Sequence, residues 1–436
     1  MNYEETLSWL YARLPMFSSQ GASAYKADLH NIRALCDALG NPERQFRSIH
    51  VAGTNGKGSV SHMLASVFQS AQYKTGLYTS PHLHDFRERF RINGHWIETD
   101  YVIAFTERCM PLVEAIEPSF FELTVAMAFS WFAEQRVDIA IIETGLGGRL
   151  DSTNIITPEL SVITNIGWDH MQILGDTLPK IAAEKAGIIK PGIPVVVGET
   201  QAEVAAVFEE TAQRSASALV FADQQRAIQE WSWNSGMLEI ALTDKHHADL
   251  QHYRLDLTGV YQLRNALTVL AATDQMRSLG WNLPREAIHE GLARARRQTG
   301  LGGRWEQLHE HPLVIADVAH NPDGIKQLQA QLEWTLYDKL HIVLGMVRDK
   351  DVTSSLGLMP KDARYYFTQA SIPRAMPADQ LQSLAASHGL TGSPFEDLHQ
   401  ALQAAVSAAR KEDLVLVCGS VFLVGEIDLV RIHFPG

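Results

Sequence analysis

One segment of the chain combines glycine, lysine and hydroxyl side chains in the way that a phosphate-binding loop requires. The segment GTNGKGS, residues 53–59, follows a strand-like apolar run and precedes a helical pattern at 58–72. Glycines let backbone N–H groups converge on phosphate oxygens, and the start of a helix adds the positive end of its dipole. In such a loop Lys57 reaches the β- and γ-phosphates of a nucleotide, and Ser59 or Thr54 is placed to hold Mg²⁺.

The spacing of this segment departs from the general phosphate-loop pattern G-x-x-x-x-G-K-[ST]. Two residues separate Gly53 from Gly56, and Gly58 stands between Lys57 and Ser59. The alternative interpretation is a glycine-rich turn between a strand and a helix, with a solvated lysine. The strand before the segment and the helix after it favour the phosphate loop.

Polar side chains follow several of the other strand-like runs, at the point where each run ends. Ser80 follows the second run, Glu143 ends the third, and His170 follows the fourth. In a parallel sheet the carboxyl ends of the strands meet at one edge, where ligands bind. We therefore expect Lys57, Ser80, Glu143 and His170 to converge there, with Glu143 as an oxygen ligand of the kind that Mg²⁺ prefers.

A second glycine-rich segment, GLGGRLD at 145–151, resembles a dinucleotide-binding fingerprint only superficially. Glu143 precedes its glycines and no helix-opening pattern follows, whereas the fingerprint must open a helix. The segment is not predicted to bind a dinucleotide.

Short apolar runs that alternate with helical patterns must position these groups. Buried parallel strands are near-continuous apolar runs, and alternating strands and helices predict a parallel sheet with helices packed on it. Residues 217–257 interrupt the alternation with short segments that favour antiparallel strands. The predicted strands are 46–53, 73–80, 137–144, 160–167, 193–199, 312–318, 340–346, 364–369 and 413–419, and the predicted helices include 58–72, 121–135, 177–188, 260–279 and 285–296.

The glycine-rich segment QTGLGG at 298–303 is typical of a hinge or linker, and the alternation of strands and helices restarts after it. The predicted fold class is α/β, with a large N-terminal phosphate-loop ATPase domain and a smaller C-terminal domain built on a parallel sheet. The predicted domain ranges are 1–297 and 298–436.

Composition excludes several classes of protein. The chain has 436 residues and a formal net charge of -13, whereas nucleic-acid binders usually carry a basic patch. Its three cysteines, Cys36, Cys109 and Cys418, show no metal-ligand spacing and fit no disulfide framework. The start lacks a secretory signal, and no apolar stretch reaches about 18 residues. We expect a cytoplasmic, monomeric protein without nucleic-acid or membrane partners.

A series of motifs, in order along the chain, resembles one family. The series is GTNGKGS, TSPHL (79–83), ETGLGGRLD (143–151), WDH (168–170), EKAGIIK (184–190), GR (303–304), DVAHNP (317–322), GMVRDKD (345–351) and GSVFLVGE (419–426). Together they resemble the folylpolyglutamate synthases and dihydrofolate synthases, a branch of the ATP-dependent ligases that includes the muramyl amino-acid ligases.

The resemblance implies ATP-dependent ligation of L-glutamate to folates and to dihydropteroate, with ATP as co-substrate and Mg²⁺ as cofactor. ATP would convert a carboxylate to an acyl phosphate, which the amine of glutamate attacks. The implied nucleotide-binding residues are Thr54, Asn55, Gly56, Lys57, Gly58, Ser59, Gln262, Asn265, Arg304 and Asp317. The implied metal ligands are Ser59, Ser80, Glu143 and His170.

The resemblance also implies catalytic roles for Lys57, Lys185 and His320, with Lys185 carbamylated. The ordinary interpretation of Lys185 is a surface cation of a helix. The implied folate-binding residues are Pro81, His82, Phe120, Phe121 and Asp151, together with a basic and aromatic loop at 81–95. Many relatives carry a histidine where this chain has Tyr261.

Two other functions fit part of this pattern. A muramyl-type ligase shares the phosphate loop but is disfavoured by TSPHL, by EKAGI and by the absence of an additional domain before the loop. A phosphate-loop ATPase that forms no bond would hydrolyse ATP without needing both a folate and glutamate.

Overall fold

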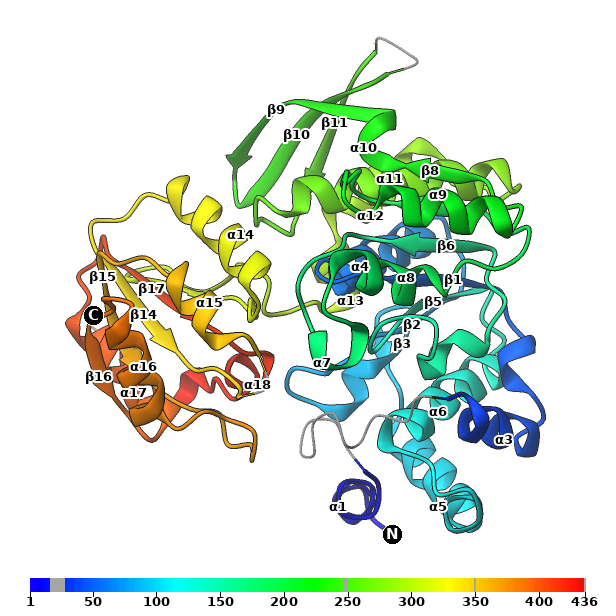
Figure 1. Cartoon of the computed structure of the whole chain (residues 1–436), viewed down its shortest axis with the longest axis horizontal. Coiled ribbons are helices and arrows are strands. Elements are labelled where there is room, and N and C mark those ends of the chain that lie inside the picture. Colours follow the sequence, from blue (N-terminus) through cyan, green and yellow to red (C-terminus); the bar gives the residue numbers. More distant parts are fainter. Residues whose placement is uncertain (16–27, 246–248, 349, 435–436) are drawn as a thin grey trace. The chain divides into compact units, whose positions relative to one another are not determined.

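The computed structural model describes residues 1–15, 28–245, 249–348 and 350–434, which Figure 1 shows as a cartoon. The chain divides into two compact units. The first contains Met1–Gly167, Met171–Leu257 and Gln262–Leu301, and the second contains Trp168–His170, Thr258–Tyr261 and Gly302–Gly436. The main crossing between them lies at Leu301 and Gly302.

The first unit is built on a sheet whose described strands follow the order β4-β3-β2-β5-β1-β6-β7-β8. Every neighbouring pair is parallel except β2 with β3 and β3 with β4. The predicted α/β class is therefore confirmed, as are the first five predicted strands. The strands are β1 Ser48–Ala52, β2 Thr75–Tyr78, β3 Phe90–Ile92, β4 His95–Trp96, β5 Ile139–Glu143, β6 Leu160–Ile163, β7 Val195–Val197 and β8 Leu219–Phe221.

Helices cover both faces of this sheet. Along β5, Ile139 and Ile141 belong to one apolar cluster, and Ala140 and Ile142 belong to another on the opposite face. Burial on both faces explains why the strands are continuous apolar runs. The helices of this unit are α1 Tyr3–Arg13, α3 His30–Ala38, η2 Pro42–Arg44, α4 Lys57–Ser70, α5 Thr99–Ile116, α6 Phe120–Glu134, η4 Ser152–Ile155, α7 Met171–Leu174, α8 Leu178–Ala186, α9 Ala205–Arg214, α10 Ala222–Gln225, α11 Gln262–Ser278, α12 Arg285–Ala293 and α13 Ala295–Thr299.

The segment 81–95, expected to be a loop, is largely ordered secondary structure. It forms a short 3-10 helix, η3 (Phe86–Arg89), and then β3 and the start of β4. Phe86 and Phe90 are buried in the apolar cluster beside α6. Because these two rings are core residues, they do not offer a flat surface to a ligand.

Residues within 226–244 and 250–255 form a separate antiparallel sheet with the order β11-β10-β9, visible in green in Figure 1. Its strands are β9 Arg226–Asn234, β10 Met237–Asp244 and β11 Leu250–Leu255. The antiparallel strands predicted within 217–257 are confirmed, except that 219–221 joins the parallel sheet as β8.

The second unit has a sheet with the order β12-β13-β17-β14-β15-β16. All its pairs are parallel except β12 with β13, so the predicted parallel sheet carries one antiparallel edge strand. Its strands are β12 Glu306–His309, β13 Leu313–Ala316, β14 Leu340–Leu344, β15 Ala363–Phe367, β16 Gly392–Pro394 and β17 Leu414–Cys418. Its helices are α14 Pro322–Glu333, α15 Val352–Gly357, α16 Ala378–Ser387, α17 Leu398–Ala408, α18 Val421–Gly425 and η5 Leu429–Arg431.

The predicted linker at 298–303 begins later than its sequence indicates. Gln298 and Thr299 are the last residues of α13, and Gly300 ends that helix with φ 68°. The hydroxyl of Thr299 lies 2.8 Å from Nδ1 of His62 on α4, and Gln298 Oε1 accepts a hydrogen bond of 2.6 Å from Ser66 Oγ. These contacts fix the first part of the segment on the first unit.

Helix α4, which begins at the glycine-rich loop, is buried on almost every side. The residues from Gly58 to Phe68 are all buried. Ser66 Oγ, which has one hydrogen to share between Gln298 Oε1 and this second acceptor, lies 2.7 Å from the carbonyl oxygen of Gly291 on α12. A Cβ atom at Gly291 would lie 2.5 Å from Cα of Val67, so α12 approaches α4 more closely than any residue but glycine permits.

Among the described residues, no helix is long and apolar enough to cross a membrane.

We predict that Gly291→Ala lowers the free energy of unfolding by about 1–3 kcal/mol, because the added methyl group overpacks the contact between α12 and α4. Chemical denaturation followed by circular dichroism measures the change. Gly357→Ala is the control: its Cβ would meet nothing closer than His388 Nδ1 at 3.6 Å. Equal stability of Gly291→Ala and the wild-type chain would contradict the close approach.

Candidate active site

The backbone of the glycine-rich loop between β1 and α4 is held by close contacts at two glycines. Gly53 has φ 145° and Gly56, the N-cap of α4, has φ 84°. A Cβ at Gly53 would lie 1.8 Å from Oγ1 of Thr164, and a Cβ at Gly56 would lie 2.4 Å from Oδ1 of Asn265. Both positions require glycine for their backbone conformation and for space.

Hydrogen bonds tie the loop to the segment that follows β6. The N–H of Thr54 donates to the carbonyl of Asn165 at 2.9 Å, and the N–H of Asn55 donates to Oδ1 of Asn165 at 3.0 Å. The hydroxyl of Thr54 accepts from the N–H of Gly167 at 2.9 Å. The role of Asn165 in shaping the loop comes from the structure.

Two lysines share one carbonyl oxygen of the loop. Lys57 Nζ donates to Gly53 O at 3.1 Å and to Thr54 O at 3.1 Å. Lys185 Nζ, from α8, donates to the same Gly53 O at 2.8 Å. The two nitrogens therefore lie at most about 6 Å apart. Lys185 is only 3% exposed, so it is not the surface cation of the ordinary interpretation.

Three of the residues predicted to bind the nucleotide form a buried chain beside the loop. Gln262 Nε2 donates to Ser59 Oγ at 3.1 Å, and Asn265 Nδ2 donates to Gln262 Oε1 at 2.8 Å. All three side chains are buried, and the start of α11 carries two of them. The structure thus brings together the predicted residues from Thr54 to Ser59 with Gln262 and Asn265.

Two of the predicted metal ligands meet where β2 and β5 end. The N–H of Ser80 donates to Oε2 of Glu143 at 3.3 Å, and Glu143 is buried. Ser59, the third predicted ligand in this unit, lies on the first turn of α4. Within the described part of the chain, no group of three or more His, Cys, Asp or Glu side chains is arranged to hold a metal ion.

His170 belongs to the second unit, where it lies in a cluster of charged groups. Lys350 Nζ is 3.0 Å from His170 Nε2 and 2.5 Å from Oδ1 of Asp169, and His320 Nε2 is 3.7 Å from Oδ2 of Asp169. Burial would raise the pKa of Asp169, but Lys350, His320 and His170 together hold that pKa well below its ordinary value. With Lys350 at His170 Nε2, a metal ion could reach that nitrogen only if the lysine moved.

Lys350 lies in the GMVRDKD motif, and the sequence predicts no role for it. Its contact with Asp169 joins segments far apart in the chain, so no local pattern predicts it.

Asp317 of the second unit is held by hydrogen bonds on both of its oxygens. Oδ2 accepts from Tyr261 Oη at 2.7 Å and from the N–H of Trp305 at 2.8 Å, and Oδ1 accepts from the N–H of Ala319 at 2.9 Å. Burial raises the pKa of Asp317 above its ordinary value. Tyr261 therefore helps to hold Asp317. Arg304 donates to the carbonyl of Gly303 at 3.2 Å.

The residues predicted to bind folate lie on three segments of the first unit. Pro81 is exposed, whereas Arg89 Nε donates to His82 Nδ1 at 2.8 Å. Burial, reinforced by Arg89, lowers the pKa of His82 to about 3. Phe120 is buried among aromatic rings, and Phe121 is half-buried against the glycine loop, where a Cβ at Gly145 would lie 2.4 Å from its Cζ.

Asp151 shapes the loop that contains it. Oδ2 accepts the N–H of Leu146 at 2.7 Å, and Oδ1 accepts the N–H of Thr153 at 3.0 Å as the cap of η4. Burial raises the pKa of Asp151, against the hydrogen bonds, which favour its ionised form. The short 3-10 helix after this loop also agrees with the rejection of a dinucleotide fingerprint, which needs a full helix.

Two family models match the chain. The Mur ligase middle domain matches residues 51–273, and the Mur ligase glutamate ligase domain matches residues 303–421.

Similar proteins match over nearly the full length. The dihydrofolate synthase/folylpolyglutamate synthase of Bacillus subtilis (strain 168) is 35% identical over 98% of both chains. The protein of the same name from Escherichia coli (strain K12) is 35% identical over 86% of this chain and 85% of its own.

Solved structures are also similar. That of E. coli FolC in complex with DHPP and ADP has a TM-score of 0.82 and 31% identity, covering 98% of this chain and 96% of that one. That of Mycobacterium tuberculosis folylpolyglutamate synthase complexed with ADP and AMPPCP has a TM-score of 0.86 and 30% identity, covering 100% of both chains.

We predict that Lys57→Ala weakens ATP binding while leaving the fold intact. A hydrogen bond from a charged group is worth about 1.5–3 kcal/mol, so the affinity should fall roughly 10- to 150-fold. Isothermal titration calorimetry measures it, with Lys361→Ala, at an exposed position of the second unit, as the control. Unchanged ATP affinity in the folded Lys57→Ala variant would refute the phosphate-loop assignment.

Proposed function

The chain belongs to the folylpolyglutamate synthases and dihydrofolate synthases of the Mur ligase family, and on that premise we propose that it joins L-glutamate to folates with the hydrolysis of ATP. The observation that carries the proposal is the full-length likeness to proteins of both names. The phosphate loop, with Gln262 and Asn265 beside it, supports ATP as the co-substrate.

The reaction would proceed through an acyl phosphate. The γ-phosphoryl group of ATP passes to a carboxylate oxygen of the folate and ADP leaves. The amine of glutamate then attacks the acyl carbon, and phosphate and a proton leave as the amide forms. Lys57 is placed on the loop to stabilise the charge of the transferring group. The backbone N–H groups at the start of α4 position the phosphates without moving during the reaction.

We propose Ser80, Glu143 and Ser59 as the residues of the first unit that hold Mg²⁺. Mg²⁺ prefers oxygen ligands and usually keeps several waters, with one or two carboxylates and the substrate phosphates completing its shell. One buried carboxylate beside a serine fits that chemistry. Bound Mg²⁺ would neutralise negative charge on the phosphates. His170 is kept as a fourth proposed ligand, conditional on movement of Lys350.

We propose that Lys185 is carbamylated in the active enzyme. Two ammonium groups within about 6 Å of each other repel, and carbamylation replaces the positive charge of Lys185 with a negative one. The carbamate nitrogen keeps one N–H, so the hydrogen bond to Gly53 O can survive the modification. A carboxylate at this buried position can also support a metal ion.

Lys185→Ala should reduce ligase activity at least tenfold, and a short-chain carboxylic acid should restore part of it by supplying the missing carboxylate. The rate with and without added acetate or propionate measures the rescue. Lys180→Ala, in the same helix but exposed, is the control. Full activity of Lys185→Ala without rescue would leave the lysine with no part in the reaction.

We further propose that residues 1–297 bind ATP and folate and that residues 298–436 form the glutamate-ligase domain. Arg304, Asp317 and His320 are proposed to act on the nucleotide and the reacting phosphate. The hydrogen bonds on Asp317 support a positioning role as well, because they fix its carboxylate at the end of β13.

The folate site is proposed at Pro81, His82, Phe120, Phe121 and Asp151. We propose that the arginines and phenylalanines of 81–95 mainly support the backbone of this site and do not contact the folate. Phe86 and Phe90 are core residues, and Arg87 pairs with Asp85 at 2.8 Å. A neutral His82, held by Arg89, is suited to hydrogen bonding rather than to ion pairing.

We propose that one active site accepts both dihydropteroate and reduced folates. A matrix of acceptors tests the activity: dihydropteroate, tetrahydrofolate and a muramyl peptide precursor, each with and without glutamate, with ADP release and amide product measured together. We expect product and ADP only when a pterin acceptor and glutamate are both present.

Each other outcome identifies a different function. Product from the muramyl acceptor alone would make the protein a muramyl-type ligase, and ADP release without any acceptor would make it an ATPase. Activity on tetrahydrofolate without any on dihydropteroate would remove the second activity and leave glutamate addition to folates.

A further inference from the structure

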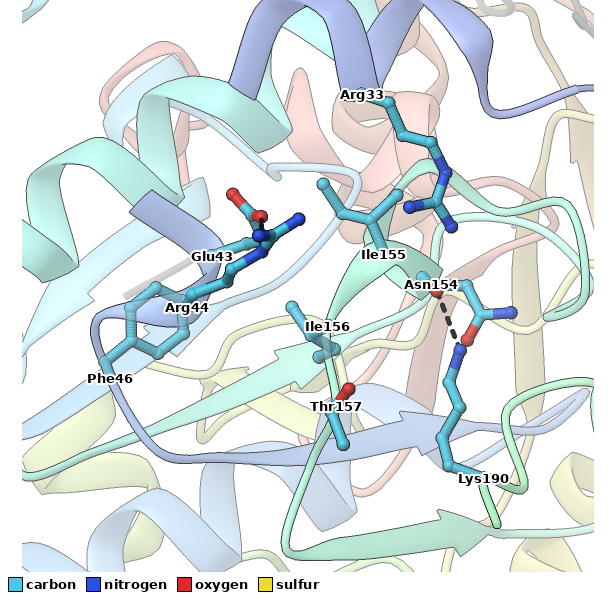
Figure 2. Close-up of a pocket in the computed structure, with 9 residues that line it drawn as sticks. All are labelled: Arg33, Glu43, Arg44, Phe46, Asn154, Ile155, Ile156, Thr157 and Lys190. Atoms are coloured by element: carbon cyan, nitrogen blue, oxygen red, sulfur yellow. Dashed lines mark hydrogen bonds and ion pairs between the residues drawn. The ribbon is translucent and has the colours of Figure 1, made fainter. Parts of the chain in front are cut away.

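A cavity of about 490 Å³ lies in the first unit. Figure 2 shows its lining, with Arg33 reaching in from α3, Glu43 and Arg44 from η2, and Lys190 from the segment after α8. A volume of this size suits a small organic molecule.

The cavity lies at the edge of the sheet opposite the phosphate loop. Phe46 comes just before β1, and Ile156 and Thr157 come just before β6, so these lining residues mark the amino ends of two parallel strands. The phosphate loop follows the carboxyl end of β1. The cavity is therefore separate from the phosphate loop, although its lining residues Asn154 and Ile155 belong to η4, the short helix that Asp151 caps.

The charge of the lining is positive. Three cations, Arg33, Arg44 and Lys190, face one carboxylate, Glu43. Glu43 already has Arg44 Nε at 3.0 Å from its Oε1. Lys190 Nζ donates to the carbonyl of Asn154 at 2.8 Å, and burial together with Arg33 lowers the pKa of Lys190 to about 8. An anion in the cavity would relieve this repulsion between cations.

Two buried acceptors in the same lining lack a hydrogen-bond donor. Asn154 Oδ1 and Glu43 Oε2 have no partner in the described structure, although Asn154 is only 4% exposed and Glu43 only 8%. The Asn154 amide is oriented by Nδ2, which donates to the carbonyls of Arg149 and Gly187, both at 3.0 Å. A buried acceptor without a donor destabilises the folded chain, and a ligand with a hydroxyl or amino group would supply the missing hydrogen bond.

We propose that this cavity binds a small organic dianion, a phosphate monoester or a dicarboxylate, that also carries a hydroxyl or amino group. The anionic end of the ligand binds to Arg33, Arg44 and Lys190. Its hydroxyl or amino group donates hydrogen bonds to Asn154 Oδ1 and Glu43 Oε2. The apolar side chains of the lining cover its carbon atoms.

Such a ligand acts on the loop that holds Asp151. An anion that attracts the ammonium of Lys190 weakens its hydrogen bond to the carbonyl of Asn154, in the short helix η4. Asp151 caps that helix through the N–H of Thr153. Binding of a ligand in the cavity therefore changes the hydrogen bonding of the segment that carries Asp151.

Isothermal titration calorimetry with three probes tests the proposal: inorganic phosphate, glycerol 3-phosphate and L-malate. The phosphate loop is first saturated with a non-hydrolysable ATP analogue, so that it does not bind the probes. We expect glycerol 3-phosphate or malate to bind more tightly than inorganic phosphate, which lacks the donor-bearing carbon skeleton. Preference for one of the two distinguishes a phosphate ester from a dicarboxylate.

Arg33→Gln and Lys190→Gln should each lower the affinity for the preferred probe at least tenfold. Arg277 is an exposed arginine on α11, and Arg277→Gln should leave the affinity unchanged. Because Arg33 is exposed at the mouth of the cavity, its variant folds even if Lys190→Gln does not. Hydrogen exchange at 151–157 should change on binding in the wild-type chain and not in Arg33→Gln. Absence of binding by all three probes, or equal binding by Arg33→Gln and the wild-type chain, would overturn the proposal.

Discussion

The close approach of side chains to the backbone of the phosphate loop is the constraint on which the rest of the first unit depends. Thr164 at the end of β6 and Asn265 on α11 each reach so near the loop that a Cβ at Gly53 or Gly56 would overlap them. Their positions fix β6 and α11 relative to α4. Burial of α4 on almost every side then keeps the loop in place, so that N–H groups are aligned before a phosphate arrives.

Three aspartates of the two units are held by backbone groups or by a polar side chain from a distant segment. Asp151 and Asp317 accept backbone N–H groups, and burial raises the pKa of both. Asp169 is instead held by Lys350, which keeps its pKa low. The pKa values of these aspartates therefore shift in different directions because their partners differ.

The parallel sheet separates two kinds of surface. The carboxyl ends of its strands carry the loop, Ser80 and Glu143, which suit phosphate and a metal ion. The amino ends of β1 and β6 border a basic cavity that shares η4 with the segment of Asp151. Because the chain crosses from one edge to the other between β5 and β6, a single connection of residues 144–159 belongs to both surfaces.

The sequence by itself determined the features that depend on neighbouring residues. The glycine-rich loop between β1 and α4 was predictable because its glycines are close together in sequence, and the strands were predictable because burial on both faces makes each a continuous apolar run. Tertiary structure decided whatever joins distant segments: the carbonyl shared by Lys57 and Lys185, the contact of Lys350 with Asp169, and the support of Asp317 by Tyr261. It also turned part of the expected loop at 81–95 into a 3-10 helix and two short strands, because Phe86 and Phe90 find partners in the core. Spacing along a chain encodes local geometry, whereas such contacts depend on how whole elements pack.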